Sequence, residues 1–320
     1  MLKLIAETKD KGFVFVAINP NNPNGLSIDE LGYSKYSDSF EDMKKYAAER
    51  HFDFPYLYDG ETQAVAKAYG CLATPHVFLF DAEGKLRYKG RFDDSQYEDP
   101  ATVKSPDATN AVQALLAGKE VPVAVTKPHG CSTKWMSKSG GIAQRMEKWD
   151  KTPVDVEPID VAGVAALRKN GTKNLRMFNV WATWCGPCVA EFPELVTTAR
   201  KFDMRDFEFI NISLDDPKEV EAAKGFLEKH GAGLSDRWKK AVQAEGRKTN
   251  SYVFTGTSQD DLMKVIDPEW PGAIPHTVLV NAQGDIVWRH NGPIDGEELR
   301  VKVFELLGAY YKPDGTGGKD

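Results

Sequence analysis

The strongest constraint on the fold of this chain is a segment that occurs twice. Residues 73–79 read Ala-Thr-Pro-His-Val-Phe-Leu and residues 273–279 read Ala-Ile-Pro-His-Thr-Val-Leu, with Gly84 and Gly284 at the same distance beyond each block. Apolar runs with a matching pattern precede both blocks in the same order. Because proline and glycine keep their register, chance similarity of short apolar runs is the weaker explanation. The sequence therefore predicts two copies of one fold.

Length and composition agree with two globular domains. The chain has 320 residues, of which 41% are hydrophobic and 28% charged, so each copy can bury a core of its own. The formal net charge of -6 offers no basic surface, and no nucleic-acid partner is expected. No apolar run reaches the roughly 18 residues that a membrane-spanning helix needs. The acidic residue Glu7 interrupts the N-terminal apolar residues before they reach the length of a signal-peptide core, so a signal peptide is not expected.

Short apolar runs alternate with amphipathic stretches in both copies, which is typical of an α/β fold with a buried sheet. We expect strands at 13–18, 76–80, 85–91, 176–181, 207–214, 277–280 and 285–290. We expect helices at 39–50, 61–69, 112–117, 142–149, 217–230 and 297–307, and one that starts after residue 185. The second copy therefore reads β-α-β followed by a hairpin.

Prolines and glycines punctuate the stretch between the two copies, which indicates a linker. The sequence predicts a first domain at 1–120, a linker at 121–152 and a second domain at 153–311. The polar, glycine-rich end at 312–320 predicts a disordered tail.

A Cys-x-x-Cys motif at Cys185 and Cys188 follows a predicted strand and opens an amphipathic helix. One helical turn brings both sulfurs close enough for a disulfide, with the first exposed and the second buried. The unpaired N–H groups at the helix start stabilise a thiolate at Cys185, which makes it the nucleophile and Cys188 the resolving thiol. Pro187 suits the first helical turn, and Gly186 leaves room for a substrate backbone.

The alternative for this motif is half of a zinc site, which needs a second pair of ligands. Cys71 and Cys131 are solitary, and the six histidines show no ligand spacing. His76 and His276 follow the matched prolines, which favours a role in the fold for both. We therefore expect no metal and no other cofactor.

The segment 179–193, Asn-Val-Trp-Ala-Thr-Trp-Cys-Gly-Pro-Cys-Val-Ala-Glu-Phe-Pro, resembles the active-site segment of the thioredoxin superfamily, and most of all that of TlpA/ResA-like thiol-disulfide oxidoreductases. The resemblance covers about residues 154–311 and implies a central mixed sheet flanked by helices. It also implies that Ile274-Pro275 is the cis-proline loop facing the two cysteines, with the backbone of Ile274 available to an extended substrate.

Two positions refine this resemblance. Asn179 stands where thioredoxins carry a buried acid, and Glu191 resembles the acid that TlpA/ResA-like proteins place after the motif, although a solvated helix-surface residue is the alternative. Residues 236–272 are expected to be an extension that walls the substrate groove, with core or lid packing of Trp270 as the alternative. The resemblance implies the catalytic residues Cys185, Cys188 and Glu191, and the substrate-binding residues Trp184, Gly186, Pro187, Ile274 and Pro275.

The first copy resembles the redoxin and peroxiredoxin-like thioredoxin families through residues 17–20, 54–59, 68–75 and 130–135. By the spacing in the second copy, its first strand and its redox motif would fall before Met1, so this copy lacks both. A truncated chain is expected, with a degenerate domain completed in some other way as the alternative. No Pro-x-x-x-Thr-x-x-Cys peroxidatic motif is present, and Cys71 and Cys131 are expected to be small buried residues.

These features predict a thiol-disulfide oxidoreductase that reduces protein disulfides through its dithiol, because the Gly-Pro dipeptide and Trp184 favour the reducing end of the potential range. An oxidase or isomerase is the neighbouring alternative. A client-binding first copy coupled to the redox domain, or a peroxiredoxin-like antioxidant, are two others. The resemblance implies protein disulfide substrates, an upstream thiol electron donor such as a membrane thiol relay, and an extracytoplasmic location, periplasmic or membrane-tethered, in the full-length protein.

Overall fold

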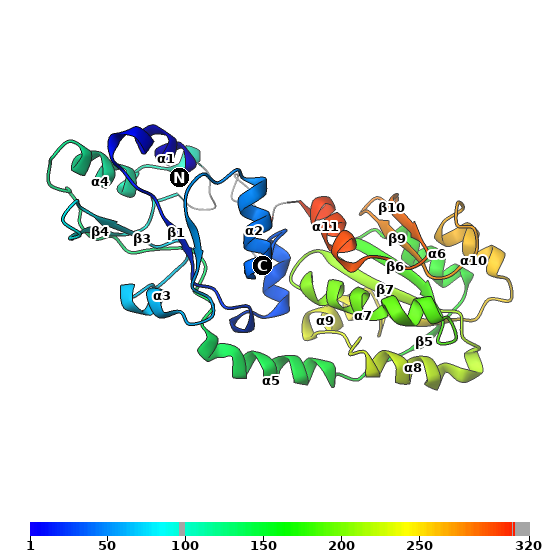
Figure 1. Cartoon of the computed structure of the whole chain (residues 1–320). Coiled ribbons are helices and arrows are strands. Elements are labelled where there is room, and N and C mark those ends of the chain that lie inside the picture. Colours follow the sequence, from blue (N-terminus) through cyan, green and yellow to red (C-terminus); the bar gives the residue numbers. More distant parts are fainter. Residues whose placement is uncertain (96–99, 309, 311–320) are drawn as a thin grey trace. The chain divides into compact units, whose positions relative to one another are not determined.

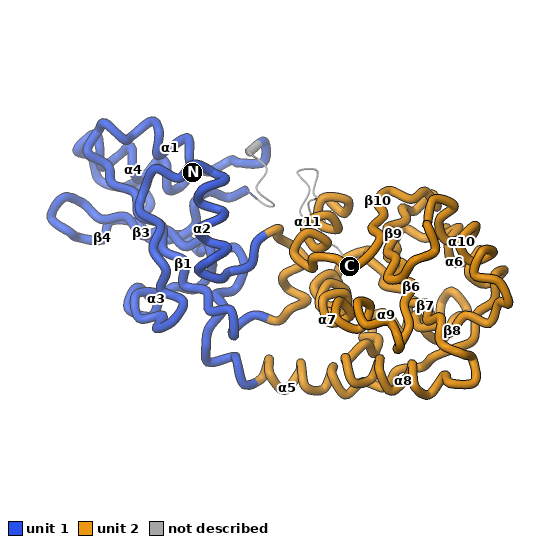
Figure 2. The backbone as a smooth tube through the Cα atoms, turned by 45° about the vertical axis from the view of Figure 1, so that its right-hand side comes forward, with its two compact units in different colours: residues 1–26, 36–140, 311–320 blue, residues 27–35, 141–310 orange. Residues whose placement is uncertain are grey.

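The computed structural model describes residues 1–95, 100–308 and 310, and these form two compact units. Unit 1 comprises residues 1–26 and 36–140, and unit 2 comprises residues 27–35 and 141–310 (Figure 2). The tail predicted at 312–320 lies outside the described residues. The domain limits at 120 and 152 stay a prediction.

A six-stranded mixed sheet forms the centre of unit 2, in the order β10-β9-β6-β7-β8-β5 (Figure 1). Its strands are β5 (Glu157–Ile159), β6 (Leu175–Trp181), β7 (Phe207–Ser213), β8 (Ser251–Phe254), β9 (His276–Val280) and β10 (Ile286–Asn291). β6 is parallel to β7 and antiparallel to β9, and every residue of β6 is buried. A run of apolar residues too short for a helix forms such a doubly covered strand.

Helices cover both faces of this sheet. They are α6 (Val161–Lys169), α7 (Gly186–Lys201), α8 (Val220–Lys229), α9 (Asp236–Ala244), α10 (Gln259–Ile266) and α11 (Gly296–Leu307). α5 (Ser139–Asp150) precedes them and has no buried residue. Met177 of β6 packs with residues of α7 and α11, whereas its neighbour Phe178 packs with residues of α6 and α10. Successive side chains of a strand point to opposite faces, so β6 anchors two hydrophobic layers.

The structure corrects the interpretation of residues 236–272 as an extension. Residues 251–254 form β8, which pairs with β7 and β5, and α10 packs against α6. The segment is therefore part of the sheet and its helical cover, and Trp270 is buried in the core with only 2% of its surface exposed.

A piece of the N-terminal half belongs to unit 2. The 3₁₀ helix η3 (Ile28–Tyr33) lies against α7, and Gly32 approaches it so closely that a Cβ there would lie 2.4 Å from the Lys201 carbonyl oxygen. Arg205 donates a hydrogen bond of 2.7 Å to the Gly32 carbonyl oxygen. No sequence pattern predicted this contact between distant segments.

Unit 1 contains two separate strand pairs. β1 (Ala17–Asn19) is parallel to β2 (Tyr56–Tyr58), and β3 (Val77–Phe80) is antiparallel to β4 (Leu86–Gly90). Its helices are α1 (Leu2–Thr8), α2 (Phe40–Glu49), α3 (Ala64–Tyr69) and α4 (Asp107–Leu116). The other 3₁₀ helices among the described residues are η1 (Lys9–Lys11), η2 (Pro23–Gly25), η4 (Pro100–Thr102), η5 (Met136–Lys138) and η6 (Pro217–Glu219).

The repeat explains why these pairs stay apart. By sequence, β1 and β2 correspond to β7 and β8, and β3 and β4 correspond to β9 and β10. In unit 2, β6 lies between β7 and β9, but no described strand of unit 1 occupies that place. The strand predicted over 13–18 is accordingly reduced to β1, and Val14 is 78% exposed. The α/β class, with a central mixed sheet flanked by helices in unit 2, is confirmed.

Candidate redox site

The two cysteines lie where the central strand passes into its helix. β6 ends at Trp181, and Cys185 is the N-cap of α7. The sulfurs of Cys185 and Cys188 form a disulfide of 2.06 Å, and the backbone N–H of Cys188 donates a hydrogen bond of 3.3 Å to Sγ of Cys185. Cys185 keeps 7% of its surface exposed, whereas Cys188 is fully buried. Only Cys185 is accessible to an incoming substrate.

The residues around Cys185 leave its surroundings open. The side chain of Trp184 is 68% exposed. A Cβ added at Gly186 would meet no heavy atom within 4 Å. Pro187 occupies the first turn of α7, where its missing N–H costs no helical hydrogen bond. A polypeptide could therefore approach the sulfur across this turn.

The loop before β9 faces the same sulfur. The peptide bond between Ile274 and Pro275 is cis, as the resemblance implied. The carbonyl oxygen of Ile274 lies 3.7 Å from Sγ of Cys185. β9 pairs directly with β6, and this pairing brings the loop and the cysteines together although they are far apart in sequence. Of the predicted substrate residues, Trp184, Gly186 and Pro187 flank Cys185 in the chain, and the loop with Ile274 and Pro275 faces its sulfur, while their role in substrate binding stays a prediction.

Glu191 is buried behind the disulfide, with 4% of its surface exposed, so it is not a solvated surface residue. Its carboxyl oxygens accept hydrogen bonds from the backbone N–H of Ile294 at 2.9 Å and from Nδ2 of Asn179 at 3.1 Å. Burial raises the pKa of Glu191 to about 7, although both hydrogen bonds act in the opposite direction. It lies one helical turn from Cys188, and its catalytic role stays a prediction.

One side chain beside the motif was missed from the sequence. The buried carboxylate of Asp215 accepts hydrogen bonds from the backbone N–H of Thr183 at 3.1 Å and from the Thr183 hydroxyl at 2.6 Å. The Ser213 hydroxyl donates to it as well. Asp215 therefore fixes the turn that carries Trp184 and Cys185. Its position just after β7 is its only signal in the sequence.

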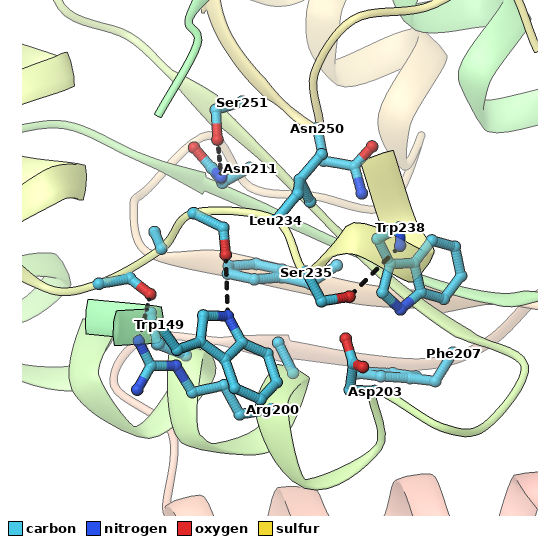
Figure 3. Close-up of a pocket in the computed structure, with 16 residues that line it drawn as sticks. Trp149, Arg200, Asp203, Phe207, Asn211, Leu234, Ser235, Trp238, Asn250 and Ser251 are labelled. Carbon is cyan, nitrogen blue, oxygen red and sulfur yellow. Dashed lines mark hydrogen bonds between the residues drawn. The ribbon is translucent and has the colours of Figure 1, made fainter. Parts of the chain in front are cut away.

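A separate cavity of about 50 Å³ lies near the other end of α7 (Figure 3). Trp149, Arg200, Asp203 and Trp238 are among the residues that line it, and none of the predicted redox residues is. Burial raises the pKa of Asp203 to about 6. The indole N–H of Trp149 donates a hydrogen bond of 3.1 Å to the Gly233 carbonyl oxygen. The cavity is thus distinct from the redox site.

The other two cysteines are free thiols in unit 1. Cys71 is half-buried and Cys131 is exposed, so the expectation that both are buried is wrong for Cys131. Across residues 1–95, 100–308 and 310, no group of three or more His, Cys, Asp and Glu side chains is placed to hold a metal ion. Within the same residues, none of the helices is both long and apolar enough to cross a membrane.

Among curated proteins, the chain is similar to a thiol:disulfide interchange protein DsbE homolog from Paracoccus denitrificans, with 30% identity over 141 residues, or 44% of this chain and 62% of the relative. It is 23% identical to the thiol:disulfide interchange protein HelX from Rhodobacter capsulatus, over 62% of this chain and 81% of the relative. The match to the DsbE homolog therefore spans less than two thirds of that relative.

A shorter match of 30% identity joins the chain to the thiol-disulfide oxidoreductase ResA from Oceanobacillus iheyensis, over 23% of this chain and 32% of the relative. A solved structure of a hypothetical protein from Sinorhizobium meliloti is 34% identical over 42% of this chain and 68% of that chain, with a TM-score of 0.36. The model of the Redoxin family matches residues 1–106 and 165–305. Because these segments make up most of the sequence, the chain belongs to the Redoxin family, within the thioredoxin superfamily.

Proposed function

We propose that unit 2 is a thiol-disulfide oxidoreductase that reduces protein disulfides through Cys185 and Cys188. The observation that carries the proposal is the joint placement of the Cys185 sulfur at the start of α7 and beside the Ile274 carbonyl oxygen. The first feature supports a reactive thiolate, because unpaired N–H groups and the helix dipole favour negative charge there. The second supplies a backbone edge on which an extended chain can be held next to the sulfur.

The reaction follows from the accessibility of the two sulfurs. In the reduced protein, the Cys185 thiolate attacks one sulfur of the substrate disulfide, whose S–S bond breaks, and the other substrate sulfur leaves as a thiolate. The Cys188 thiolate then attacks Sγ of Cys185, which restores the protein disulfide and releases the second substrate thiolate. Two electrons pass to the substrate, so a thiol donor must return them before the next cycle.

Glu191 suits the proton transfer in the second step. A carboxyl group with a pKa of about 7 exchanges protons near neutral pH, which is the condition for an efficient general base. It lies one turn beyond Cys188 on α7, and so it can take the proton from that buried thiol. Asn179, at the position of the thioredoxin acid, cannot act in this way because an amide does not titrate.

The proposal includes protein disulfides as substrates, an upstream thiol donor, and an extracytoplasmic location. The similarity to thiol:disulfide interchange proteins from Paracoccus and Rhodobacter supports disulfide exchange as the reaction class. A membrane thiol relay is the proposed donor. The direction of exchange is proposed as reduction, with oxidation or isomerisation as the alternative.

The two other candidates have less support. A client-binding unit 1 would need the backbone beside its own cis-proline, yet Thr74 already exchanges hydrogen bonds of 2.8 and 3.1 Å with Cys131. A peroxiredoxin-like activity would need a peroxidatic motif, which the sequence does not contain. Both therefore remain alternatives to the reductase.

Insulin reduction tests the proposal. We expect Cys185→Ser to abolish turnover, because no other described cysteine caps a helix beside an accessible backbone edge. Cys188→Ser should instead accumulate a mixed disulfide with the substrate through Cys185. Cys71→Ser is the matched control and should leave turnover unchanged. Full activity of Cys185→Ser would rule the proposal out.

A further inference from the structure

The loop that carries Ile274 and Pro275 is held from behind by the indole of Trp270. The indole N–H donates a hydrogen bond of 2.7 Å to the carbonyl oxygen of Ala273, the first residue of the loop. A second bond of 2.9 Å runs from the Gly292 N–H to the Pro275 carbonyl oxygen. The backbone on both sides of Ile274 is therefore fixed by partners outside the loop.

His276, the residue after Pro275, extends this support into the core. Its ring stacks on Trp270 with a centroid distance of 4.8 Å and an interplanar angle of 7°. Its Nδ1 lies 2.8 Å from Oδ1 of Asn291, and its Nε2 lies 3.4 Å from Oδ2 of Asp267. The His276 side chain is fully buried, so these contacts and not solvent determine its orientation.

Asp267 connects the histidine to the sheet edge. Its buried carboxylate accepts two hydrogen bonds from Arg289 of β10, at 2.9 and 3.2 Å. Its backbone carbonyl oxygen accepts the N–H of Trp270 at 2.9 Å. A buried carboxylate is retained where its charge is paired, as it is here by Arg289. Asp267 thus holds the backbone of Trp270 through its carbonyl oxygen, and its paired carboxylate lies beside the imidazole of His276 without a hydrogen bond to Nε2.

Unit 1 shows the same loop without this support. The sequence Pro-His recurs there as Pro75 and His76, and the bond before Pro75 is also cis. Residues 70–74, which precede it, contain neither a carboxylate nor an indole. His76 is only half-buried, and its Nδ1 accepts the Leu72 N–H at 3.3 Å. The buried cluster is therefore not a requirement of the Pro-His turn itself.

We propose that Asp267, Trp270 and His276 are positioning residues that hold the backbone of Ile274 in the orientation that a substrate polypeptide pairs with. The inference rests on the proposed reductase function and deepens it, because it concerns only substrates that are bound through their backbone. A loop that must be ordered during binding reduces affinity, whereas a preorganised one does not. A small disulfide reacts with the Cys185 sulfur without backbone pairing, so its reaction rate does not depend on the order of the loop.

Two conservative substitutions test this. Trp270→Phe keeps a ring against His276 but removes the hydrogen bond to Ala273, and Asp267→Asn keeps the shape but weakens the pairing with Arg289. We expect each to raise KM for insulin by about tenfold, because the loop must then be ordered during binding, with kcat nearly unchanged. The rate with the small disulfide 5,5′-dithiobis(2-nitrobenzoate) should stay within about twofold of the parent.

The matched control is Trp238→Phe, a buried tryptophan of unit 2 at the separate cavity, which should leave both rates unchanged. Equal changes with insulin and with the small disulfide would show that the cluster only supports folding, and unchanged KM in both variants would also overturn the inference. If the parent chain reduces neither compound, the proposed function fails instead. If insulin reduction depends on Cys185 but is unchanged in Trp270→Phe and Asp267→Asn, the proposed function holds and the inference is wrong.

Discussion

Nδ2 of Asn179 donates a hydrogen bond of 3.1 Å to the carboxyl group of Glu191 in the interior of unit 2. The same Nδ2 lies 3.0 Å from the Thr277 hydroxyl, while Oδ1 of Asn179 has no hydrogen-bond partner among the described residues. A donated N–H stabilises the ionised carboxylate, so this hydrogen bond lowers the pKa of Glu191 and opposes the effect of its burial. Burial has the larger effect, and the pKa of Glu191 is raised to about 7.

Glu191→Gln should stabilise unit 2 above pH 7. The folded pKa of about 7 exceeds the usual value of 4.5, so between these values the folded chain holds a proton that the unfolded chain has released. The free energy of unfolding of the parent must therefore fall as pH rises through this window, by up to about 3 kcal/mol. The glutamine variant lacks this titration and should keep its stability.

Urea unfolding of both proteins from about pH 4 to about pH 8, a range that brackets the folded and unfolded pKa of Glu191, measures the difference. Glu194→Gln is the control, because Glu194 is on the same helix but is about half exposed and pairs with Arg300. Parallel profiles for the parent and Glu191→Gln would contradict the assigned titration.

Asp215→Ala should destabilise the turn before Cys185. It leaves the Thr183 N–H, the Thr183 hydroxyl and the Ser213 hydroxyl without their acceptor. Loss of such a buried partner costs about 1–3 kcal/mol, and the misplaced turn should also slow insulin reduction. Asp155→Ala, at an exposed position of unit 2, is the control and should change neither thermal unfolding nor turnover. Full activity and stability in Asp215→Ala would show that the turn needs no such support.

The sequence predicted those parts of the site that depend on local spacing. The resemblance to TlpA/ResA-like proteins pointed to Glu191 and Pro275, and the one-turn spacing from Cys188 and the repeated Pro-His turn agree with it. Asp215 and Trp270 act through contacts between segments distant in sequence, and neither belongs to a local motif. Residues 13–16 were assigned to a strand on apolarity alone, but a strand also needs a hydrogen-bonded neighbour, which the described part of unit 1 does not provide.

Gly32→Ala should destabilise unit 2 although residue 32 lies far from it in sequence. The added Cβ would lie 2.4 Å from the Lys201 carbonyl oxygen, a backbone atom that cannot move aside freely. The chain must shift and strain the hydrogen bond from Arg205, at a cost of about 1–3 kcal/mol. Gly225→Ala in α8, where a Cβ meets nothing within 4 Å, should be neutral or stabilising. Thermal unfolding distinguishes the two, and equal stability would refute the contact.

The segment at residues 130–136 crosses unit 1 at its cis-proline, and we call it the strap. Lys134 anchors the strap to unit 1, because its carbonyl oxygen accepts hydrogen bonds from the Asn22 N–H at 3.0 Å and from the Gln63 side-chain amide at 2.9 Å. Gly130 has a φ of +148°, and a Cβ there would lie 2.4 Å from the Thr74 carbonyl oxygen. Gly130→Val should therefore separate the start of the strap from Thr74.

Alkylation of Cys71 reports this separation, because its Sγ lies 3.6 Å from the hydroxyl of Thr133 within the strap. We expect Gly130→Val to speed modification of Cys71 by iodoacetamide about tenfold, which corresponds to a local opening made easier by about 1.4 kcal/mol. Cys131 is already exposed and should react at nearly the parent rate in the same sample. Gly140→Val, where a Cβ meets nothing within 4 Å, is the matched control. If Cys71 reacts no faster in Gly130→Val than in that control, the strap does not cover it.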